Sequence, residues 1–217
     1  MAAAQSRGIF VTLEGGEGSG KTTLAAAIGE FFVDQGEPVC LTREPGGTEL
    51  GSRIESILEG KEESSPLSAL AELLLFEADR VQHVLEVIVP ALTAGQIVVC
   101  DRFTDSSLAY QGYGRGLDLN LIRRFNDEAT GGVAPHLTLL LDVPPEQGLS
   151  RDGVQKDVTG RENVEFHQSV RAGFLELAHA EPERFVVIDG GRAIEEVRAE
   201  AIAAVTEKVS QIRGATG

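Results

Sequence analysis

Five short apolar segments recur along the chain, and a stretch with helical spacing separates most of them from the next. Apolar side chains fill both alternating sets of positions in these segments, which is typical of strands that are buried on both faces. The predicted strands span residues 8–14, 38–42, 96–101, 136–143 and 184–189. Their alternation with helices predicts an α/β fold in which a parallel sheet is covered on both sides.

Apolar residues spaced three and four apart predict the helices between these strands. In the first helix Leu24, Ile28 and Phe32 share one face, and Gly36 follows as a C-terminal stop. The predicted helices span residues 21–35, 48–58, 67–92, 119–129, 145–150, 164–180 and 194–212, and the longest has a break near Pro90. Residues 61–66 and 151–163 are polar and aperiodic, so we expect loops there.

The composition is typical of one globular domain, which we expect to span residues 1–217. Of the 217 residues 42% are hydrophobic, and 34 acidic against 19 basic residues give a net charge of −15. A chain this acidic, without a run of Lys or Arg, is not expected to bind nucleic acid. The longest uncharged central stretch, residues 87–100, contains Pro90 and Gly95 and is too short to span a membrane.

The N-terminal residues and the two cysteines both bear on the compartment in which the protein works. Residues 1–7 are short and polar and lack the apolar core of a signal peptide. Cys40 and Cys100 stand at the ends of apolar runs, where buried free thiols are more common than a disulfide or a metal site. The sequence therefore predicts a cytoplasmic protein.

A glycine-rich motif directly follows the first predicted strand and opens the first predicted helix. The stretch Gly15-Gly-Glu-Gly-Ser-Gly-Lys-Thr22 fits the phosphate-binding pattern G-x-x-x-x-G-K-[ST]. Its glycines let backbone N–H groups surround phosphate oxygens, Lys21 supplies charge to the β- and γ-phosphates, and the Thr22 hydroxyl can bind Mg²⁺. We predict a three-layer P-loop NTPase-type fold that binds ATP with Mg²⁺. The predicted ATP-binding residues of this loop are Gly15, Gly16, Glu17, Gly18, Ser19, Gly20, Lys21, Thr22 and Thr23.

Three classes of protein carry such a loop: small-molecule kinases, switch GTPases and ATPases that drive a partner. The chain has no Asn-Lys-x-Asp guanine motif, which disfavours a GTPase. Asp101 ends an apolar strand as in many motor ATPases, but Arg102 directly after it is unusual for that role. An arginine at the carboxyl end of a strand, beside the phosphate loop, better suits a second phosphate group.

Other polar residues form the pattern expected of an acceptor pocket. Residues 43–48 and 101–116 each follow a predicted strand and are rich in hydrogen-bonding groups. Phe76 and Arg80 lie four residues apart on one predicted helix, so a ring and a guanidinium share a face. Phe76 alone would be read as a core aromatic, but Arg is rarely buried without a partner.

With these motifs in place, the chain resembles the thymidylate kinases, which transfer the γ-phosphoryl group of ATP to dTMP. The resemblance runs from about residue 9 to residue 205. It rests on Leu-Glu-Gly, Arg-Glu-Pro-Gly-Gly-Thr, Leu-Phe-x-Ala-x-Arg-x-Gln-His, Asp-Arg-Phe and Ala-Tyr-Gln-Gly-x-Gly-Arg-Gly, in this order. It implies a homodimer formed through helices on one face of the sheet, and a place in dTTP biosynthesis.

The resemblance implies a role for each matching residue of the acceptor pocket. Phe76 would stack on the thymine ring, while Arg80 would pair with O4 and Gln111 with N3 and O4. Ser107 would assist from the same loop, and Tyr110 would press on the sugar where a ribose 2′-hydroxyl would lie. Arg43 and Arg102 would hold the acceptor phosphate, with Pro45 beside them.

The resemblance also implies the catalytic and metal-binding groups. The catalytic residues would be Lys21, Arg102, Glu14 and Arg161, and the Mg²⁺ site would involve Thr22, Glu14 and Asp101. In the bacterial branch of the family a lid supplies an arginine that the phosphate loop lacks. Here Glu17 stands in the loop, and Arg151, Lys156 and Arg161 lie in a lid of about residues 151–163. Arg161 is the expected catalytic arginine, and Arg151 is expected near adenine.

The chain departs from the family pattern at two places. Its lid is short and poor in arginine, and Arg161 lies only five residues before Phe166. Glu55 stands where relatives often carry a phosphate-contacting arginine, and the nearby Arg53 is on a different face of the helix. Two alternatives remain at this point: a kinase for another acceptor such as dUMP, and a nucleotide-binding regulator that has lost turnover.

Overall fold

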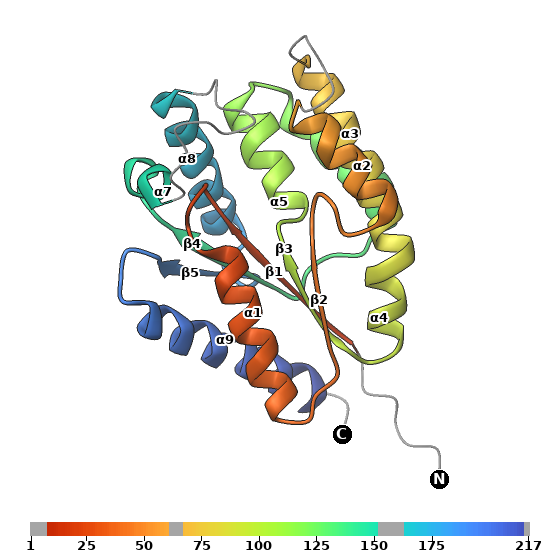
Figure 1. Cartoon of the computed structure of the whole chain (residues 1–217), viewed down its shortest axis with the longest axis vertical. Helices are drawn as coiled ribbons and strands as arrows, with labels where there is room; N and C mark the ends of the chain where they lie inside the picture. The colour runs from red at the N-terminus through yellow and green to blue at the C-terminus, as the bar shows by residue number, and fades with distance from the viewer. Residues whose placement is uncertain (1–7, 61–66, 152–162, 215–217) are drawn as a thin grey trace.

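The computed structural model describes residues 8–60, 67–151 and 163–214. Its centre is a parallel sheet of five strands in the order β2-β3-β1-β4-β5 (Figure 1). The strands are β1 (Ile9–Gly15), β2 (Val39–Arg43), β3 (Ile97–Asp101), β4 (Leu137–Asp142) and β5 (Phe185–Asp189). All five predicted strands are confirmed to within two residues at each end.

Strand β1 occupies the middle of the sheet, and this position decides where the phosphate loop lies. It pairs with β3 from Ile9 opposite Ile97, and with β4 from Val11 opposite Leu137. All seven residues of β1 are buried, as expected for a central strand covered by helices on both faces. The loop that follows β1 therefore lies at the carboxyl edge of the sheet, between the ends of its two neighbours.

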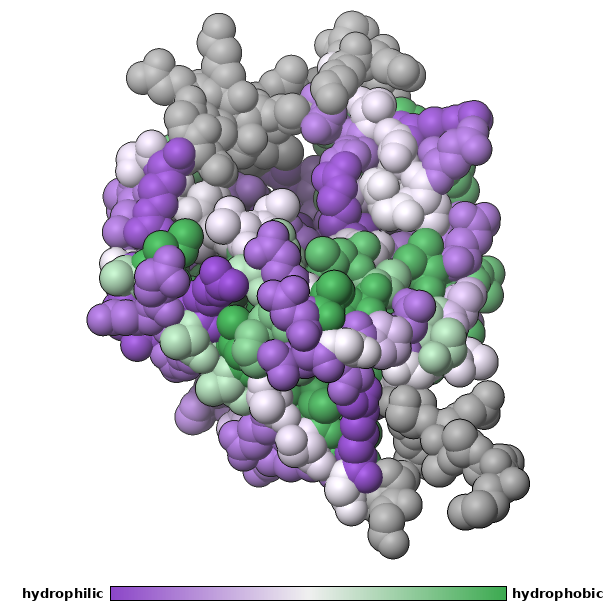
Figure 2. Space-filling view, turned by 60° about the horizontal axis from the view of Figure 1, so that its bottom comes forward, coloured by the Kyte–Doolittle hydropathy of each residue, from purple (hydrophilic) through white to green (hydrophobic). Residues whose placement is uncertain are grey.

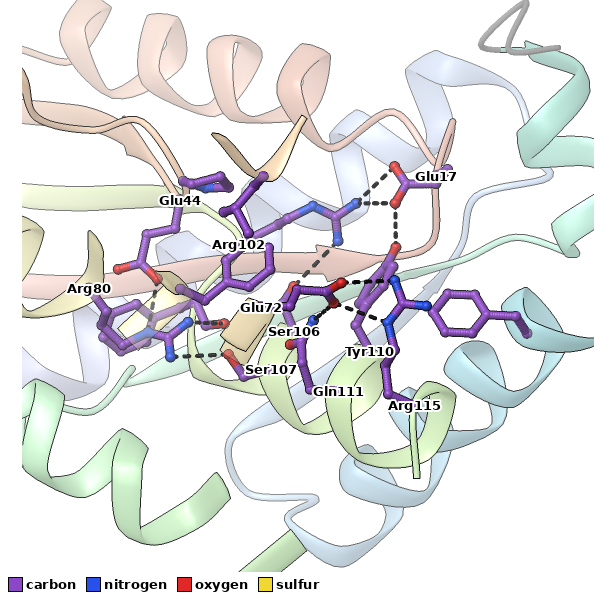
Figure 3. A pocket seen from close by; sticks show the side chains of 15 residues that line it. Glu17, Glu44, Glu72, Arg80, Arg102, Ser106, Ser107, Tyr110, Gln111 and Arg115 are labelled. Atoms are coloured by element: carbon purple, nitrogen blue, oxygen red, sulfur yellow. Dashed lines mark hydrogen bonds and ion pairs between the residues drawn. The ribbon is translucent and has the colours of Figure 1, made fainter. Parts of the chain in front are cut away.

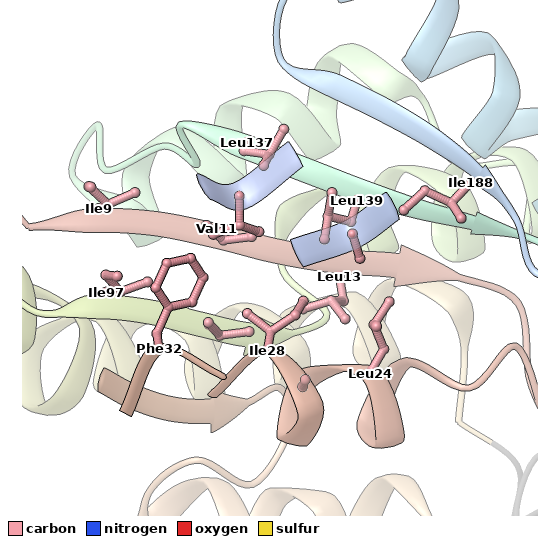
Figure 4. Packing of buried hydrophobic residues seen from close by; sticks show 14 of the residues in the cluster. Ile9, Val11, Leu13, Leu24, Ile28, Phe32, Ile97, Leu137, Leu139 and Ile188 are labelled. Atoms are coloured by element: carbon pink, nitrogen blue, oxygen red, sulfur yellow. The ribbon is translucent and has the colours of Figure 1, made fainter. Parts of the chain in front are cut away.

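Helices cover both faces of the sheet. On one face, α1 (Lys21–Asp34) and α9 (Ile194–Gly214) run side by side (Figure 1). Leu24, Ile28 and Phe32 of α1 pack there against apolar side chains of the central strands, including Leu13 and Ile97 (Figure 4). This face contains the largest apolar cluster of the described residues, so the helix that begins at Lys21 is fixed firmly to the sheet.

The remaining helices follow the predicted order. They are α2 (Glu49–Leu58), α3 (Ala69–His83), α4 (Val89–Thr93), α5 (Thr104–Ser107), α6 (Leu119–Thr130), α7 (Pro145–Arg151) and α8 (Val164–Ala180). Side-chain caps mark several of the starts: Thr48 accepts from the Gly51 N–H, and Asn163 accepts from the Phe166 N–H. The predicted loop at residues 61–66 and most of the predicted lid lie outside the described residues.

The long predicted helix is not interrupted at Pro90. Instead α3 continues through a π-helical turn, Val84–Ile88, into α4, which has Pro90 in its first turn. Proline lacks an N–H and its ring crowds the preceding turn, so the wider turn accommodates it without ending the helix.

A helical segment after β3 was not predicted. No helix was predicted within residues 101–116, whereas the structure forms α5 and a second π-helical stretch, Leu108–Gly114. Within the described residues no helix is long and apolar enough to cross a membrane.

Cys100 is buried and Cys40 is half-buried, and both are free thiols. This agrees with the prediction except for the partial exposure of Cys40. The prediction of a single domain stays a prediction.

Candidate active site

The phosphate loop connects β1 to α1 in a conformation that its glycines permit. Gly15, Gly18 and Gly20 have φ angles of 143°, 61° and 93°, which side chains with a Cβ rarely adopt. The Lys21 ammonium lies across the loop and donates to the carbonyl oxygens of Gly15 at 3.1 Å and Gly16 at 2.8 Å. The loop thus holds its lysine and its N–H groups ready for phosphate oxygens before any nucleotide binds.

Opposite charges face each other at the mouth of the loop. Arg102 Nη2 donates to both carboxylate oxygens of Glu17 at 3.1 Å, and the Tyr110 hydroxyl donates to Glu17 Oε1 at 2.7 Å. Burial alone would raise the pKa of Glu17, but Arg102 and Lys21 outweigh it and lower it to about 2. Burial and the charge of Arg102 lower the pKa of Lys21 to about 8. Three charged groups therefore lie within one small, partly desolvated site.

A candidate magnesium site lies beside the loop, at the end of β3. The Thr22 hydroxyl donates to Asp101 Oδ2 at 2.6 Å. The other carboxylate oxygen, Oδ1, is buried and has no hydrogen-bond partner. Mg²⁺ prefers one or two protein oxygens and completes its shell with water and phosphate, so these two side chains fit the ion. Within the described residues no group of three or more His, Cys, Asp or Glu side chains could hold a metal ion by itself.

The residue that follows strand β3 has strained backbone geometry. Arg102 has a φ of 70°, and it is the only described residue other than glycine with a positive φ. Its Nη1 donates to the Gly15 carbonyl oxygen at 3.1 Å, which joins the two loops. This conformation directs the guanidinium toward the phosphate loop and away from the strand.

Glu14 holds the segment after β3. It is fully buried; its Oε1 accepts from the Phe103 N–H at 2.8 Å and its Oε2 from the Ser106 hydroxyl at 2.6 Å. Burial and the nearby Asp105 raise its pKa above the ordinary range. Since both oxygens are engaged in the loop, we assign Glu14 to positioning that loop, and its predicted part in the metal shell stays a prediction.

The predicted acceptor residues other than Arg43 line one pocket (Figure 3). Glu72, Phe76 and Arg80 succeed one another at intervals of four residues on α3 and all line it. Tyr110 and Gln111 reach it from the π-helical stretch after α5. This unusual turn presents two consecutive side chains to the cavity, which is consistent with the frequent presence of π-turns at functional sites.

Arg80 is almost completely buried, with 1% of its surface exposed. Its Nε donates to Glu44 at 2.9 Å and its Nη1 to Glu77 at 2.8 Å, and Nη2 donates to the Phe103 carbonyl oxygen at 3.2 Å. Ser107 accepts from Nη1 at 3.1 Å, so it helps to hold the guanidinium, and its predicted part in binding the base stays a prediction. The network fixes the guanidinium as a rigid part of the pocket wall.

Glu72 and Arg115 are among the pocket residues that the sequence did not single out. Glu72 accepts from Gln111 Nε2 at 2.7 Å and from Arg115 Nη2 at 2.9 Å. A signal for Glu72 was available, because it precedes Phe76 by four residues and so shares the helix face already singled out. Arg115 is the arginine of the Ala-Tyr-Gln-Gly-x-Gly-Arg-Gly motif, so the motif itself was the signal for it; its guanidinium lies 5.0 Å from the centre of the Phe166 ring.

The other predicted residues lie around the same site. Arg43 forms a bidentate ion pair with Glu55, with both contacts at 2.7 Å. Glu55, which stands where relatives often carry an arginine, thus binds the arginine that is expected to hold the acceptor phosphate. Pro45 lines both the acceptor pocket and the phosphate-loop pocket. Arg151 donates to the Gly190 carbonyl oxygen at 3.0 Å beside the phosphate loop. Lys156 and Arg161 lie outside the described residues, so the predicted catalytic role of Arg161 stays a prediction.

Three pockets join into one continuous site. The acceptor pocket and the phosphate-loop pocket share Glu17, Glu44, Pro45 and Arg102. The phosphate-loop pocket in turn shares Gly18, Ser19, Gly20 and Thr23 with a third pocket that is lined by Arg151 and residues of α9. A donor nucleotide and an acceptor can therefore lie end to end, with their phosphates meeting at Arg102.

Comparison with known proteins agrees with this geometry. The family model described as thymidylate kinase matches residues 13–201. A thymidylate kinase of a Synechococcus strain is 56% identical over 192 residues, covering 88% of this chain and 91% of that protein. One from Deinococcus radiodurans is 50% identical over 206 residues, covering 94% and 98%.

A solved structure resembles the whole fold. It is the crystal structure of thymidylate kinase from Ehrlichia chaffeensis, with a TM-score of 0.75 and 36% identity over 92% of this chain and 99% of that one. The residues matched by the family model, 13–201, include the phosphate loop and every residue that lines the acceptor pocket. The chain belongs to the thymidylate kinase family.

Proposed function

We propose that this chain transfers the γ-phosphoryl group of ATP to dTMP, giving ADP and dTDP, at the junction of the two pockets. The observation that carries the proposal is the shared wall of Glu17, Glu44, Pro45 and Arg102 between the phosphate-loop pocket and the acceptor pocket. An oxygen of the dTMP phosphate attacks the γ-phosphorus, and the bond to the β,γ-bridging oxygen breaks. The attacking oxygen is already anionic, so the reaction depends on positioning and charge neutralisation.

The donor nucleotide binds along the phosphate loop. We assign the triphosphate to the N–H groups of the loop and to Lys21, and the adenosine to the adjoining pocket beside Arg151. Thr22 and Asp101 would hold Mg²⁺, as the buried, unpartnered Asp101 Oδ1 supports. When bound, the ion neutralises charge on the β- and γ-phosphate oxygens.

The acceptor binds between α3 and the segment after β3. Phe76 offers a half-buried ring to the base, and Arg80 offers an N–H of Nη2 to a base carbonyl. Arg102 receives the acceptor phosphate, and Tyr110, directly beside Arg102 and Glu17, closes the pocket around the sugar. Arg43 lines the phosphate-loop pocket at the same junction, and it would bind the acceptor phosphate when its ion pair with Glu55 opens.

A homodimer is supported by an apolar stripe on the helix that carries Phe76 and Arg80. Leu70, Leu74, Val81, Leu85 and Val89 are between 38% and 64% exposed and share one face of α3 and its continuation. In Figure 2 hydrophobic surface reaches the right-hand edge of the molecule, on the side where α4 lies in Figure 1. Light scattering on the protein should give twice the chain mass, and Leu85→Glu should give the single chain mass.

The closing experiment measures ADP release from Mg·ATP with dTMP, dUMP, UMP, dCMP, dGMP and AMP. We expect strong turnover with dTMP, weak turnover with dUMP and negligible turnover, orders of magnitude below that with dTMP, with the others. Turnover with a different monophosphate would keep the kinase and refute the assignment of the base pocket. Binding of ATP without turnover of any monophosphate would favour the regulator instead. The free thiols of Cys40 and Cys100 support the cytoplasm as the site of action.

A further inference from the structure

Glu72 links three elements at the back of the acceptor pocket (Figure 3). Its Oε1 accepts from Gln111 Nε2 at 2.7 Å and from Arg115 Nε at 3.2 Å, and its Oε2 accepts from Arg115 Nη2 at 2.9 Å. Only 13% of the Glu72 side chain is exposed. Arg115 is itself held against the ring of Phe166 on α8. The carboxylate therefore has one fixed position next to Gln111.

This contact determines which way the Gln111 amide points. A carboxylate only accepts hydrogen bonds, so the group that faces Glu72 must be the amide NH₂. The carbonyl oxygen, Oε1, then points to the other side. In many proteins the orientation of an amide is a matter of assignment, but here the chemistry of the partner fixes it.

We propose that Glu72, held by Arg115, is a positioning residue that sets base specificity by locking the Gln111 amide in one orientation. The inference rests on the proposed function, because it takes the acceptor to be a pyrimidine monophosphate bound beside Gln111 and Arg80. The lock selects a base edge in which a ring N–H adjoins a carbonyl group, as in thymine and uracil. It rejects the cytosine edge, in which a ring nitrogen acceptor adjoins an amino group.

Cytosine is rejected because either orientation of the Gln111 amide would bring two hydrogen-bond acceptors face to face. In the locked orientation Gln111 Oε1 accepts the N3–H of thymine, and Arg80 donates to O4. Cytosine would place its unprotonated N3 against Oε1. Rotating the amide by 180° would remove that clash of acceptors. It would, however, place Oε1 about 2.7 Å from the Glu72 carboxylate, where the NH₂ group now lies. Either arrangement leaves buried acceptors facing each other, which is strongly unfavourable.

The test is the variant Glu72→Gln, with kcat/KM measured separately for dTMP, dUMP and dCMP. A glutamine at this position both donates and accepts, so it supports either orientation of Gln111. We expect the dTMP to dCMP ratio of kcat/KM to fall about tenfold or more. The dTMP to dUMP ratio should stay within about twofold of the parent, because these two bases present the same edge to Gln111.

Asp142→Asn is the matched control. Asp142 forms a comparable bidentate pair with Arg171, with contacts of 2.6 and 2.8 Å, away from the pocket. It should leave both ratios unchanged. Arg115→Gln loosens Glu72 without removing it and should shift the dCMP ratio in the same direction by less, which keeps the idea testable if Glu72→Gln does not fold.

The possible results distinguish a failure of the role of Glu72 from a failure of the proposed kinase function. An equal loss of kcat/KM for all three substrates in Glu72→Gln would show a merely structural role and overturn the inference. An unchanged dTMP to dCMP ratio in a folded variant would overturn it too. A parent protein that does not phosphorylate dTMP would instead refute the proposed function.

Discussion

Gly148 on α7 lies against the phosphate loop, and alanine at this position tests whether that contact holds the loop in place. A Cβ at residue 148 would lie 2.2 Å from the Glu17 carbonyl oxygen, whereas real Cβ atoms essentially never come within 3.0 Å of a neighbour. The reverse contact is as close, because a Cβ on Gly18 would lie 2.0 Å from the Gly148 carbonyl oxygen. Both neighbours are backbone atoms, so no side chain can swing away to make room.

The structure sets the size of the effect. To restore contact at 3.0 Å, α7 and the phosphate loop must separate by about 0.8 Å. A shift of about 1 Å in a positioned group costs about 100-fold in rate. Overpacking costs about 1–3 kcal/mol of stability, against a gain of about 0.5–1 kcal/mol from replacing a helical glycine. We therefore expect kcat/KM for ATP to fall about 100-fold and the free energy of unfolding to fall by about 1–2 kcal/mol.

The assay is the initial rate of ADP release at saturating dTMP over a range of ATP concentrations, together with urea unfolding. Gly214→Ala is the control, since Gly214 is also helical and a Cβ there would meet nothing within 4 Å. It should leave the kinetics unchanged. A folded Gly148→Ala protein with the parent's KM for ATP and kcat would refute the view that α7 positions the phosphate loop.

Three further changes test other parts of the site. Asp101→Asn should raise the Mg²⁺ concentration needed for half-maximal ADP release at least tenfold, because the charged oxygen proposed for the ion is lost; an unchanged titration would remove Asp101 from the metal site. Arg102→Lys keeps the charge but loses the fork, so kcat should fall by about 100-fold, and a parent-like rate would place the acceptor phosphate elsewhere. Burial and the charge of Glu44 raise the pKa of Asp79 from 3.8 to about 6. Because the folded-state pKa is the higher one, ionisation of Asp79 destabilises the fold progressively from about pH 4 to pH 6. Asp79→Asn should thus gain up to about 3 kcal/mol over the parent above pH 6 and nothing below pH 3.5, in urea unfolding followed across pH; a gain independent of pH would contradict this.

The sheet and the phosphate loop could be predicted because their signals are local. A strand buried on both faces is a continuous apolar run, and the glycines of the loop are needed for its own backbone angles. The signals failed where the fold depends on partners distant in sequence. Residues 104–107 look like a polar loop, yet they form α5 because Ser106 donates to Glu14 and Asp105 pairs with Arg184 at 2.7 Å. These contacts span more than 75 residues of sequence, so spacing cannot reveal them.

The candidate site was predictable in its residues but not in their pairings. The sequence indicated Phe76 and Arg80 because they share a helix face, and Arg102 because it ends a strand. It did not indicate that Arg43 would pair with Glu55, or that Glu17 would pair with Arg102. Ion pairs between different elements depend on strand order and helix placement, which the apolar pattern does not specify.

The carboxylates around the two pocket arginines explain why each suits a different part of the acceptor. Arg80 contacts both Glu44 and Glu77, and its own side chain is only 2% exposed. With two carboxylates against one guanidinium, it offers hydrogen bonds without net positive charge, which fits a neutral base carbonyl and disfavours a phosphate. Arg102 contacts the single carboxylate of Glu17, whose side chain is 26% exposed. An incoming phosphate can replace Glu17 on Arg102, because it offers the guanidinium the same kind of bidentate acceptor with more negative charge. An acidic chain thus binds an anion with the arginine that only one carboxylate contacts, and it uses the arginine that two carboxylates neutralise for the uncharged end of the same substrate.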